Sequence, residues 1–240
     1  MIDSFDNQRV LVIGGSSGIG EATALRAAKA GAAVTIAARS RDRLDAALQR
    51  LPAGTLAQVL DVTDVAAVET LFATQGPWDH VVLAGSSTQV GPVRTLSLEA
   101  AQAGMQNKFW GAYHVGRSAR VVRGGSLTLV SGVYAQRPNP AAVLQGAINA
   151  AVEGLMRGLA LELAPDGVRV NAVSPSTTAT PLWDRLGEAG RERKFAEMRE
   201  RLPLNRVADP DDIARAILFV ATNPFATGST VLVDGGDALV

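Results

Sequence analysis

Short apolar runs alternate with amphipathic stretches along the whole chain, and turn residues separate them. The apolar runs are continuous, which is typical of parallel strands buried on both faces of a sheet. We expect strands at residues 10–13, 33–38, 55–60, 78–84, 126–131, 168–173 and 229–233.

The stretches between these runs carry apolar residues three and four positions apart, which is the spacing of one helix face. A clear case is Leu44, Ala47, Leu48 and Leu51. We expect helices at residues 21–30, 42–51, 64–75, 97–121, 141–163, 180–201 and 209–221. The βα alternation predicts an α/β fold: a single Rossmann-type, doubly wound domain over residues 1–240, with a parallel seven-stranded sheet and helices on both faces.

The first strand leads into a glycine-rich turn that opens a helix. Residues 10–20 read Val-Leu-Val-Ile-Gly-Gly-Ser-Ser-Gly-Ile-Gly. Glycine lets the main chain approach a pyrophosphate closely, and the free N–H groups at the helix start face an anion. A glycine turn can be only a turn, but its place in a βαβ unit favours a nucleotide site. The cofactor contacts expected here are Gly14, Ser16, Ser17, Gly18, Ile19 and Gly20.

The end of the second strand indicates which dinucleotide binds. A carboxylate there would hold the ribose hydroxyls of NAD, but the chain has Ala37-Ala38-Arg39-Ser40 instead. A guanidinium matches a 2′-phosphate by bidentate hydrogen bonding. We therefore expect NADP(H) as the cofactor, with Arg39 and Ser40 as contacts. The alternative for Arg39 is a solvated basic start to a surface helix.

Ligands of doubly wound sheets lie beyond the carboxyl ends of the strands, so residues after the later strands are also candidates. Asp61 suits a contact to the adenine amino group or a helix cap. Thr178 and Thr180 suit the nicotinamide amide or a phosphate, unless Thr180 caps the next helix. The set expected at these strand ends is Asp61, Val62, Ala84, Gly85, Pro175, Thr178 and Thr180.

Composition mainly excludes classes of function. Basic and acidic residues balance at 23 each, so charge gives no reason to expect nucleic acid or a membrane surface as a partner. The chain has no cysteine and two histidines, which argues against a disulfide, a thiolate nucleophile or a metal site. Residues 1–6 lack the apolar core of a secretory signal, and no apolar run is long enough to span a membrane. The default expectation is a soluble cytoplasmic protein.

Over essentially its whole length the chain resembles the short-chain dehydrogenase/reductase family. The matching pieces are Gly14-x-x-x-Gly18-x-Gly20, Leu60-Asp61-Val62, Asn107, Val130-Ser131, the segment 167–175 (Gly-Val-Arg-Val-Asn-Ala-Val-Ser-Pro) and Val233-Asp234-Gly235-Gly236. The resemblance implies a nicotinamide cofactor, hydride transfer between a carbonyl and an alcohol of a small-molecule substrate, and a homo-oligomer, tetramer or dimer, in which Trp110 and His114 pack at an interface. It also implies that the charged segment 180–201 covers the substrate as a mobile lid, although a plain surface helix is the equal alternative.

The chain departs from this family at its catalytic residues. The family uses a serine after the fifth strand, then a tyrosine and a lysine four residues apart on the next helix, helped by an asparagine. Counting back from Gly167 and Asn171 places Gln145 and Asn149 at the tyrosine and lysine positions. The chain has no Tyr-x-x-x-Lys, and neutral amides cannot exchange a proton at pH 7. Asn107 is retained.

The serine position falls on Ser131 or, one residue later, on Gly132. Ser131 can hydrogen-bond a substrate oxygen or be structural. Tyr134 is the best internal candidate for the missing acid, with a partly wetted wall residue as the alternative, and Arg137 can add positive charge. The expected catalytic set is Ser131, Tyr134, Asn107, Gln145 and Asn149.

Two functions are compatible with this pattern. The first is an NADP-dependent oxidoreductase with an atypical site. The second is a cofactor-binding protein without turnover, which acts as a redox sensor or as an inactive partner in an oligomer. A lyase is a more distant third.

Overall fold

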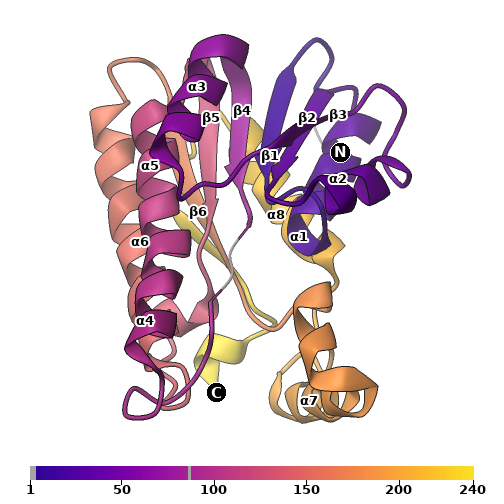
Figure 1. Ribbon diagram of the computed structural model, residues 1–240, viewed down its shortest axis with the longest axis vertical. Helices are drawn as coiled ribbons and strands as arrows, with labels where there is room; N and C mark the ends of the chain where they lie inside the picture. The colour runs from indigo at the N-terminus through magenta and orange to yellow at the C-terminus, as the bar shows by residue number, and fades with distance from the viewer. Residues whose placement is uncertain (1–3, 86–87) are drawn as a thin grey trace.

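The structure is a computed structural model that describes residues 4–85 and 88–240, so the start of the acidic N-terminal stretch lies outside it. Seven parallel strands form one sheet in the order β3-β2-β1-β4-β5-β6-β7 (Figure 1). The strands are β1 (Arg9–Ile13), β2 (Ala33–Ala38), β3 (Leu56–Val59), β4 (Trp78–Leu83), β5 (Val121–Val130), β6 (Arg169–Pro175) and β7 (Thr230–Val233). The chain order reverses between β1 and β4, which confirms the doubly wound, seven-stranded sheet expected from the sequence.

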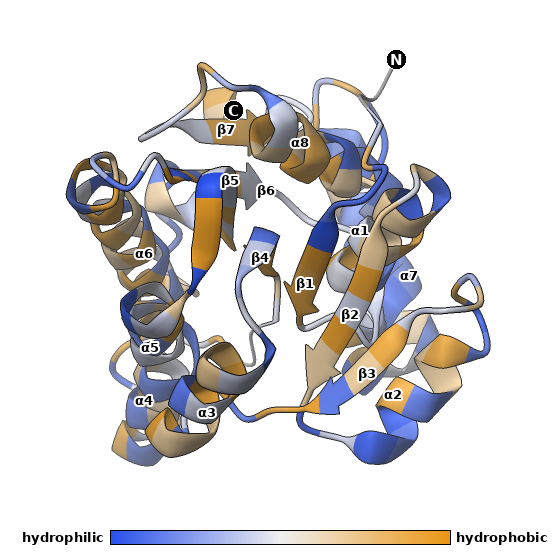
Figure 2. Ribbon diagram, turned by 90° about the horizontal axis from the view of Figure 1, so that it is seen from above, coloured by the Kyte–Doolittle hydropathy of each residue, from blue (hydrophilic) through white to orange (hydrophobic). Residues whose placement is uncertain are grey.

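Helices cover both faces of this sheet. Seen from above, α3, α5 and α6 lie on one side and α1, α2 and α8 on the other (Figure 2). The helices are α1 (Gly18–Lys29), α2 (Arg41–Leu48), α3 (Val65–Gln75), α4 (Leu98–Met105), α5 (Gly111–Ser118), α6 (Val143–Glu162), α7 (Gly187–Arg201) and α8 (Pro210–Thr222). Shorter turns are the π-helical turn η1 (Gln106–Trp110) and the 3₁₀ turns η2 (Val133–Ala135), η3 (Pro181–Leu186) and η4 (Asp237–Leu239).

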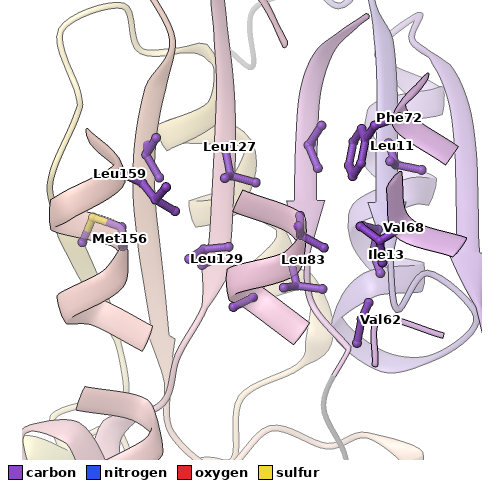
Figure 3. Packing of buried hydrophobic residues seen from close by; sticks show 14 of the residues in the cluster. Leu11, Ile13, Val62, Val68, Phe72, Leu83, Leu127, Leu129, Met156 and Leu159 are labelled. Atoms are coloured by element: carbon purple, nitrogen blue, oxygen red, sulfur yellow. The ribbon is translucent and has the colours of Figure 1, made fainter. Parts of the chain in front are cut away.

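Two hydrophobic cores lie back to back across the sheet. Successive residues of β1 point to opposite faces, so Leu11 and Ile13 join the core under α3, α5 and α6 (Figure 3), while Val10 and Val12 join the core under α1, α2 and α8. Burial on both faces explains why the strands read as continuous apolar runs.

Side-chain caps begin several of the helices where the sequence changes from strand to helix. Asp64 accepts a hydrogen bond from the Ala67 amide at the start of α3, so the third helix is capped by Asp64. Asp209 and Asp212 form a capping box at the start of α8. Since Asp64 takes the capping role, the Asp61 carboxylate is not the cap of that helix.

Two expectations about elements are wrong. The helix expected over residues 97–121 is interrupted by the π-helical turn η1 and ends at Ser118. The fifth strand was expected to follow Gly124 and Gly125, but β5 already begins at Val121 and carries both glycines inside it. Its register with β4 shifts between Trp78 and His80, so the glycines fill an irregularity of the strand rather than preceding it.

Within the described ranges, no helix combines the length and apolar character needed to cross a membrane. The same residues contain no cluster of three or more His, Cys, Asp or Glu side chains that could hold a metal ion.

Candidate active site

The glycine turn is locked to the ends of two strands by direct main-chain contact. A Cβ on Gly14, where φ is +86°, would lie 2.2 Å from the amide nitrogen of Gly85, and a Cβ on Gly20 would lie 2.1 Å from the Gly14 carbonyl oxygen. Only glycine fits at either place. The turn therefore brings together Gly14, Ser16, Ser17, Gly18, Ile19 and Gly20, with Ala84 and Gly85 beside them.

The start of α1 has no side-chain cap. Ser17 occupies the N-cap position, but its side chain makes no capping hydrogen bond. The first N–H groups of the helix are consequently left without a side-chain acceptor, and they carry the positive end of the helix dipole.

The basic residues after β2 are not equivalent. Arg41 forms an ion pair with Asp45, with Nη2 2.6 Å from Oδ1, whereas Arg39 is exposed and makes no hydrogen bond or ion pair with any described residue. The Ser40 hydroxyl caps α2 by accepting from the Arg43 amide at 3.3 Å. Arg39 is thus a guanidinium available to a ligand directly at this strand end, while Arg43, which is also exposed without an ion pair among the described residues, lies one helical turn further on in α2.

Asp61 and Val62 follow β3 and lie near the start of α3. Oδ1 of Asp61 accepts hydrogen bonds from the amide and the hydroxyl of Thr63, at 2.9 and 2.8 Å. The Val62 carbonyl accepts a hydrogen bond from Nδ1 of His114 at 2.9 Å, which holds the segment after β3 against α5. One carboxylate oxygen of Asp61 is not used in these bonds.

The segment after β6 returns to the glycine turn. A Cβ on Gly18 would lie 2.9 Å from Cγ2 of Thr180, so these two residues touch. Thr178 is buried, and its carbonyl oxygen accepts from the Trp183 indole at 2.9 Å. Thr180 occupies the N-cap position of η3 without a side-chain capping bond, so its hydroxyl does not act as a cap. Pro175 ends β6 just before this segment.

A buried polar network fills the space between the end of β5 and α6. The Ser131 hydroxyl donates to Oε1 of Glu153 at 2.8 Å, and the Gln136 amide donates to Oε2 of the same carboxylate at 2.7 Å. Ser131 and Glu153 are both buried. The Ser131 hydroxyl donates its proton to Glu153. This geometry favours a structural role for Ser131 over a role in which it donates to a substrate oxygen.

A second buried cluster joins η1 to α6. Nζ of Lys108 donates to the carbonyl oxygen of Ser131 at 2.7 Å and to Oδ1 of Asn149 at 2.6 Å. Asn149 in turn donates from Nδ2 to the Gly132 carbonyl oxygen at 3.2 Å. Burial lowers the pKa of Lys108 to about 8, and the negative charge of Glu153 partly offsets this shift.

Gly132 and Asn149 constrain each other. A Cβ on Gly132 would lie 2.7 Å from Nδ2 of Asn149. A side chain at position 132 would therefore require the amide group of Asn149 to shift.

The remaining expected catalytic residues surround these clusters. Gln145 lies on α6, four residues before Asn149, and its Oε1 is buried without a hydrogen-bond partner among the described groups. Tyr134 lies partly buried on η2, and its carbonyl oxygen would be 2.7 Å from a Cβ on Gly146. Asn107 is partly buried on η1, next to Lys108.

The C-terminal turn ties down the segments beside the strand ends. Asp237 is buried and pairs with Arg201 of α7, at 2.5 Å, and with Arg137, at 3.3 Å; it also accepts a hydrogen bond from Ser176. The positive charge of Arg137 is therefore matched within the protein. In Figure 1, α7 and α4 project beyond the carboxyl ends of the strands on opposite sides.

These features fit a nicotinamide dinucleotide. The glycine cradle leaves no room for a side chain, the α1 amides lack an acceptor, Arg39 has no acidic partner, and the Gln145 oxygen is buried without a donor. Lys108, Gln136 and Glu153 were missed from the sequence. One signal was available, since residues 145, 149 and 153 repeat polar side chains at helical spacing along an otherwise apolar helix face.

Comparison with known proteins assigns the family. Residues 14–237 match a family model described as enoyl-(acyl carrier protein) reductase. D-erythrulose reductase from Gallus gallus is 31% identical over 97% of this chain and 96% of its own length. A solved structure of a short chain dehydrogenase/reductase family protein aligns with a TM-score of 0.88 at 31% identity, covering 99% of this chain and 100% of that one.

A second solved structure also aligns with nearly the whole chain. It is the NADPH-bound short chain oxidoreductase from Pseudomonas aeruginosa PAO1, described as containing an atypical catalytic center. It aligns with a TM-score of 0.90 at 33% identity and covers 98% of each chain. Together with the doubly wound sheet and the glycine cradle, these matches show that the chain belongs to the short-chain dehydrogenase/reductase family of oxidoreductases.

Proposed function

We propose that this protein is an NADP(H)-dependent oxidoreductase that interconverts a carbonyl and an alcohol of a small molecule through an atypical active site. The observation that carries the cofactor assignment is Arg39, an exposed guanidinium without an acidic partner, at the end of β2 beside an intact glycine cradle. The NADPH-bound P. aeruginosa neighbour supports the same choice.

Different residues of this chain would bind different parts of the dinucleotide. Gly14, Ser16, Ser17, Gly18, Ile19 and Gly20 would hold the pyrophosphate at the start of α1, and Arg39 with Ser40 would bind the 2′-phosphate. Asp61 and Val62 would contact the adenine, and Ala84, Gly85, Pro175, Thr178 and Thr180 would hold the nicotinamide half. When bound, the nicotinamide ring supplies or accepts the hydride.

Reduction of a carbonyl also requires a group that donates a proton to the substrate oxygen, and oxidation of the alcohol requires a group that accepts it. Gln145 and Asn149 can orient polar groups but cannot give up a proton at neutral pH. Ser131 holds Glu153, so we assign it a positioning role. Tyr134 is the candidate acid, because its phenol lies on the loop after β5 and is partly exposed. Loss of a positioned acid costs about 10²–10⁴-fold in rate, so slow turnover is expected if Tyr134 does not serve.

The test is NADPH oxidation against a panel of small ketones, aldehydes and quinones, with wild type and Tyr134→Phe. Steady oxidation with at least one compound, reduced at least tenfold in Tyr134→Phe, supports the proposal. Tyr113→Phe is the matched control, because Tyr113 lies on α5 rather than on the loop after β5. NADPH binding without turnover across the panel would contradict catalysis.

That last outcome would favour the second function, an inactive NADP(H)-binding sensor or oligomer partner. The observation in its favour is the neutral pair Gln145 and Asn149, of which Asn149 is hydrogen-bonded to Lys108 and to the Gly132 carbonyl. Under this alternative, NADPH binds and changes the oligomer or a partner surface, while no carbonyl compound is reduced.

We also propose a homo-oligomer. Trp110 and Tyr113 are exposed on η1 and α5 and stack edge to face with a centroid distance of 5.5 Å. Such aromatic surface is typical of protein interfaces. Light scattering of wild type and Trp110→Glu would show a dimer or tetramer that dissociates in the variant.

A further inference from the structure

Lys108 is a buried cation in the middle of the site. Its side chain is 8% exposed, whereas buried lysines are rare unless they are paired. It has two neutral oxygen acceptors, Oδ1 of Asn149 and the Ser131 carbonyl. The charged group that acts on it is Glu153 of α6, which is already hydrogen-bonded to Ser131 and Gln136.

The backbone explains how a lysine reaches this place. η1 is a π-helical turn inserted between α4 and α5, and such turns hold one residue more than an α-helical turn and are frequent at functional sites. Lys108 is the buried residue of this turn. The turn thus directs one long cationic side chain into the protein while its neighbour Trp110 stays exposed.

The position of Lys108 also connects it to the cofactor side. Lys108 and Gly85 line one small cavity of about 10 Å³, close to the size that holds one water molecule. Gly85 is in main-chain contact with Gly14 of the glycine turn. An ammonium group carries three N–H donors, and two of them are used by the acceptors named above.

We propose that Lys108 and Asn149 are an exchanged pair: η1 supplies the ammonium that the family resemblance places on α6, and α6 supplies the amide. Lys108 then acts as a positioning residue of the proposed carbonyl site, and the inference rests on the proposed function. Its ammonium fixes Asn149 and, through the Ser131 carbonyl and Gly132, the main chain at the end of β5.

The first test measures the titration of the Lys108 side chain directly and does not depend on catalytic activity. The lysines of this chain are Lys29, Lys108 and Lys194, so lysine labelled with ¹³C at Cε gives a simple spectrum, assigned with Lys29→Met and Lys194→Met. We expect the Lys108 signal of the cofactor-free protein to titrate near pH 8. Added NADPH should shift that midpoint, because a cofactor bound beside Gly85 would change the burial and the charge around the ammonium group. A midpoint near 10.5, or a Lys108 signal indifferent to bound NADPH, would overturn the proposal.

The second test exchanges the two residues. Lys108→Asn and Asn149→Lys should each weaken NADPH binding at least fivefold, measured by calorimetry, and each should lower any kcat/KM at least tenfold. The double exchange should recover both to within about threefold of wild type, since it rebuilds the same pair from the opposite elements. A double variant no better than the product of the singles would contradict the exchange.

The controls separate a structural role from a positioning role. Lys29→Met removes an exposed lysine of α1 and should leave every readout unchanged. If the single variants fail to fold, the wild-type titration still decides. If wild type does not bind NADPH at all, the proposed function fails, while the cofactor-free titration and thermal rescue in the double exchange still report on the pair.

Discussion

At the scale of single residues, two arginines after β2 differ in whether an ion pair leaves the guanidinium available to a ligand. Arg41 is neutralised by Asp45, whereas Arg39 faces solvent without a partner. A free guanidinium beside a glycine cradle can bind a phosphate without first breaking an ion pair. The proposed preference for NADP(H) therefore depends mainly on Arg39.

Arg39→Asp should weaken NADPH binding by tenfold or more, because a carboxylate would repel the 2′-phosphate that the guanidinium binds. NADH binding should stay the same or improve. Calorimetric titrations with both cofactors provide the measurement, and Arg41→Ala is the matched control, expected to change neither affinity by more than about twofold. Equal losses for NADPH and NADH would mean that Arg39 does not read the phosphate.

His80, which lies away from the candidate active site, makes the folding stability of the protein sensitive to acid. Its ring lies between Ser126 and Gln8, and burial lowers its pKa from 6.5 to about 4. The unfolded chain binds a proton at this histidine as the pH falls below 6.5, while the folded chain does so only near pH 4. The stability contributed by neutral His80 is thus present above pH 6.5 and is lost as the pH falls toward 4.

Urea denaturation of wild type and His80→Gln measures this effect. Between pH 7.5 and 4.5, wild type should lose roughly 2 kcal/mol more unfolding free energy than His80→Gln, which cannot titrate. Parallel pH profiles for the two proteins would contradict a buried neutral histidine.

The sequence predicted the part of the site that depends on the main chain and missed the part that depends on side-chain packing. Glycine spacing and strand ends locate Gly14, Gly18 and Gly85 without knowledge of the tertiary structure. Lys108 could not be located in this way, because its burial results from a π-helical turn that hydrophobic periodicity does not reveal. The pairing of Ser131 with Glu153 likewise joins β5 to α6 across 22 residues.

At the scale of elements, the same distinction separates the correct expectations from the wrong ones. The run that became β2 and the helix starts at Asp64 and Asp209 follow from local signals. The start of β5 does not, because its first residues pair with β4 across an irregularity and the glycines there suggest a turn. Local chemistry specified the elements well, except where a neighbouring element changed their geometry.

The C-terminal end of α7, the helix that lies beyond the strand ends (Figure 1), is tied to the rest of the protein by the Asp237 carboxylate. Apart from Met198, the residues of α7 are at least partly exposed, and the C-terminal end of the helix is tied to η4 by Arg201 and Asp237. Because the other ion pairs on this segment are exposed, they contribute little to holding it.

Asp237→Asn should therefore loosen α7 more than any surface substitution on it. Removing one charge from a buried pair leaves Arg201 and Arg137 without their partner, and we expect a loss of about 2 kcal/mol or more in unfolding free energy. Limited proteolysis should cut α7 faster in this variant. Asp184→Asn removes only an exposed partner of Arg191 and should have little effect on either measurement.

At the scale of the whole molecule, two hydrophobic cores pack on the two faces of the sheet, and the candidate site lies at the carboxyl ends of the strands. The glycine turn, the cluster at Lys108 and the segment after β6 come from distant parts of the chain, and they meet because parallel strands end at the same edge. The fold thus supplies the cradle for the proposed cofactor, and the polar residues beside it, among them Lys108 and Asn149, differ from those that the family resemblance implies.

The most direct test of this account is a calorimetric titration of the wild-type protein with NADPH and, separately, with NADH at the same salt concentration. We predict one NADPH per chain, bound at least tenfold more tightly than NADH. Absence of heat with NADPH, or equal affinity for both cofactors, would contradict it.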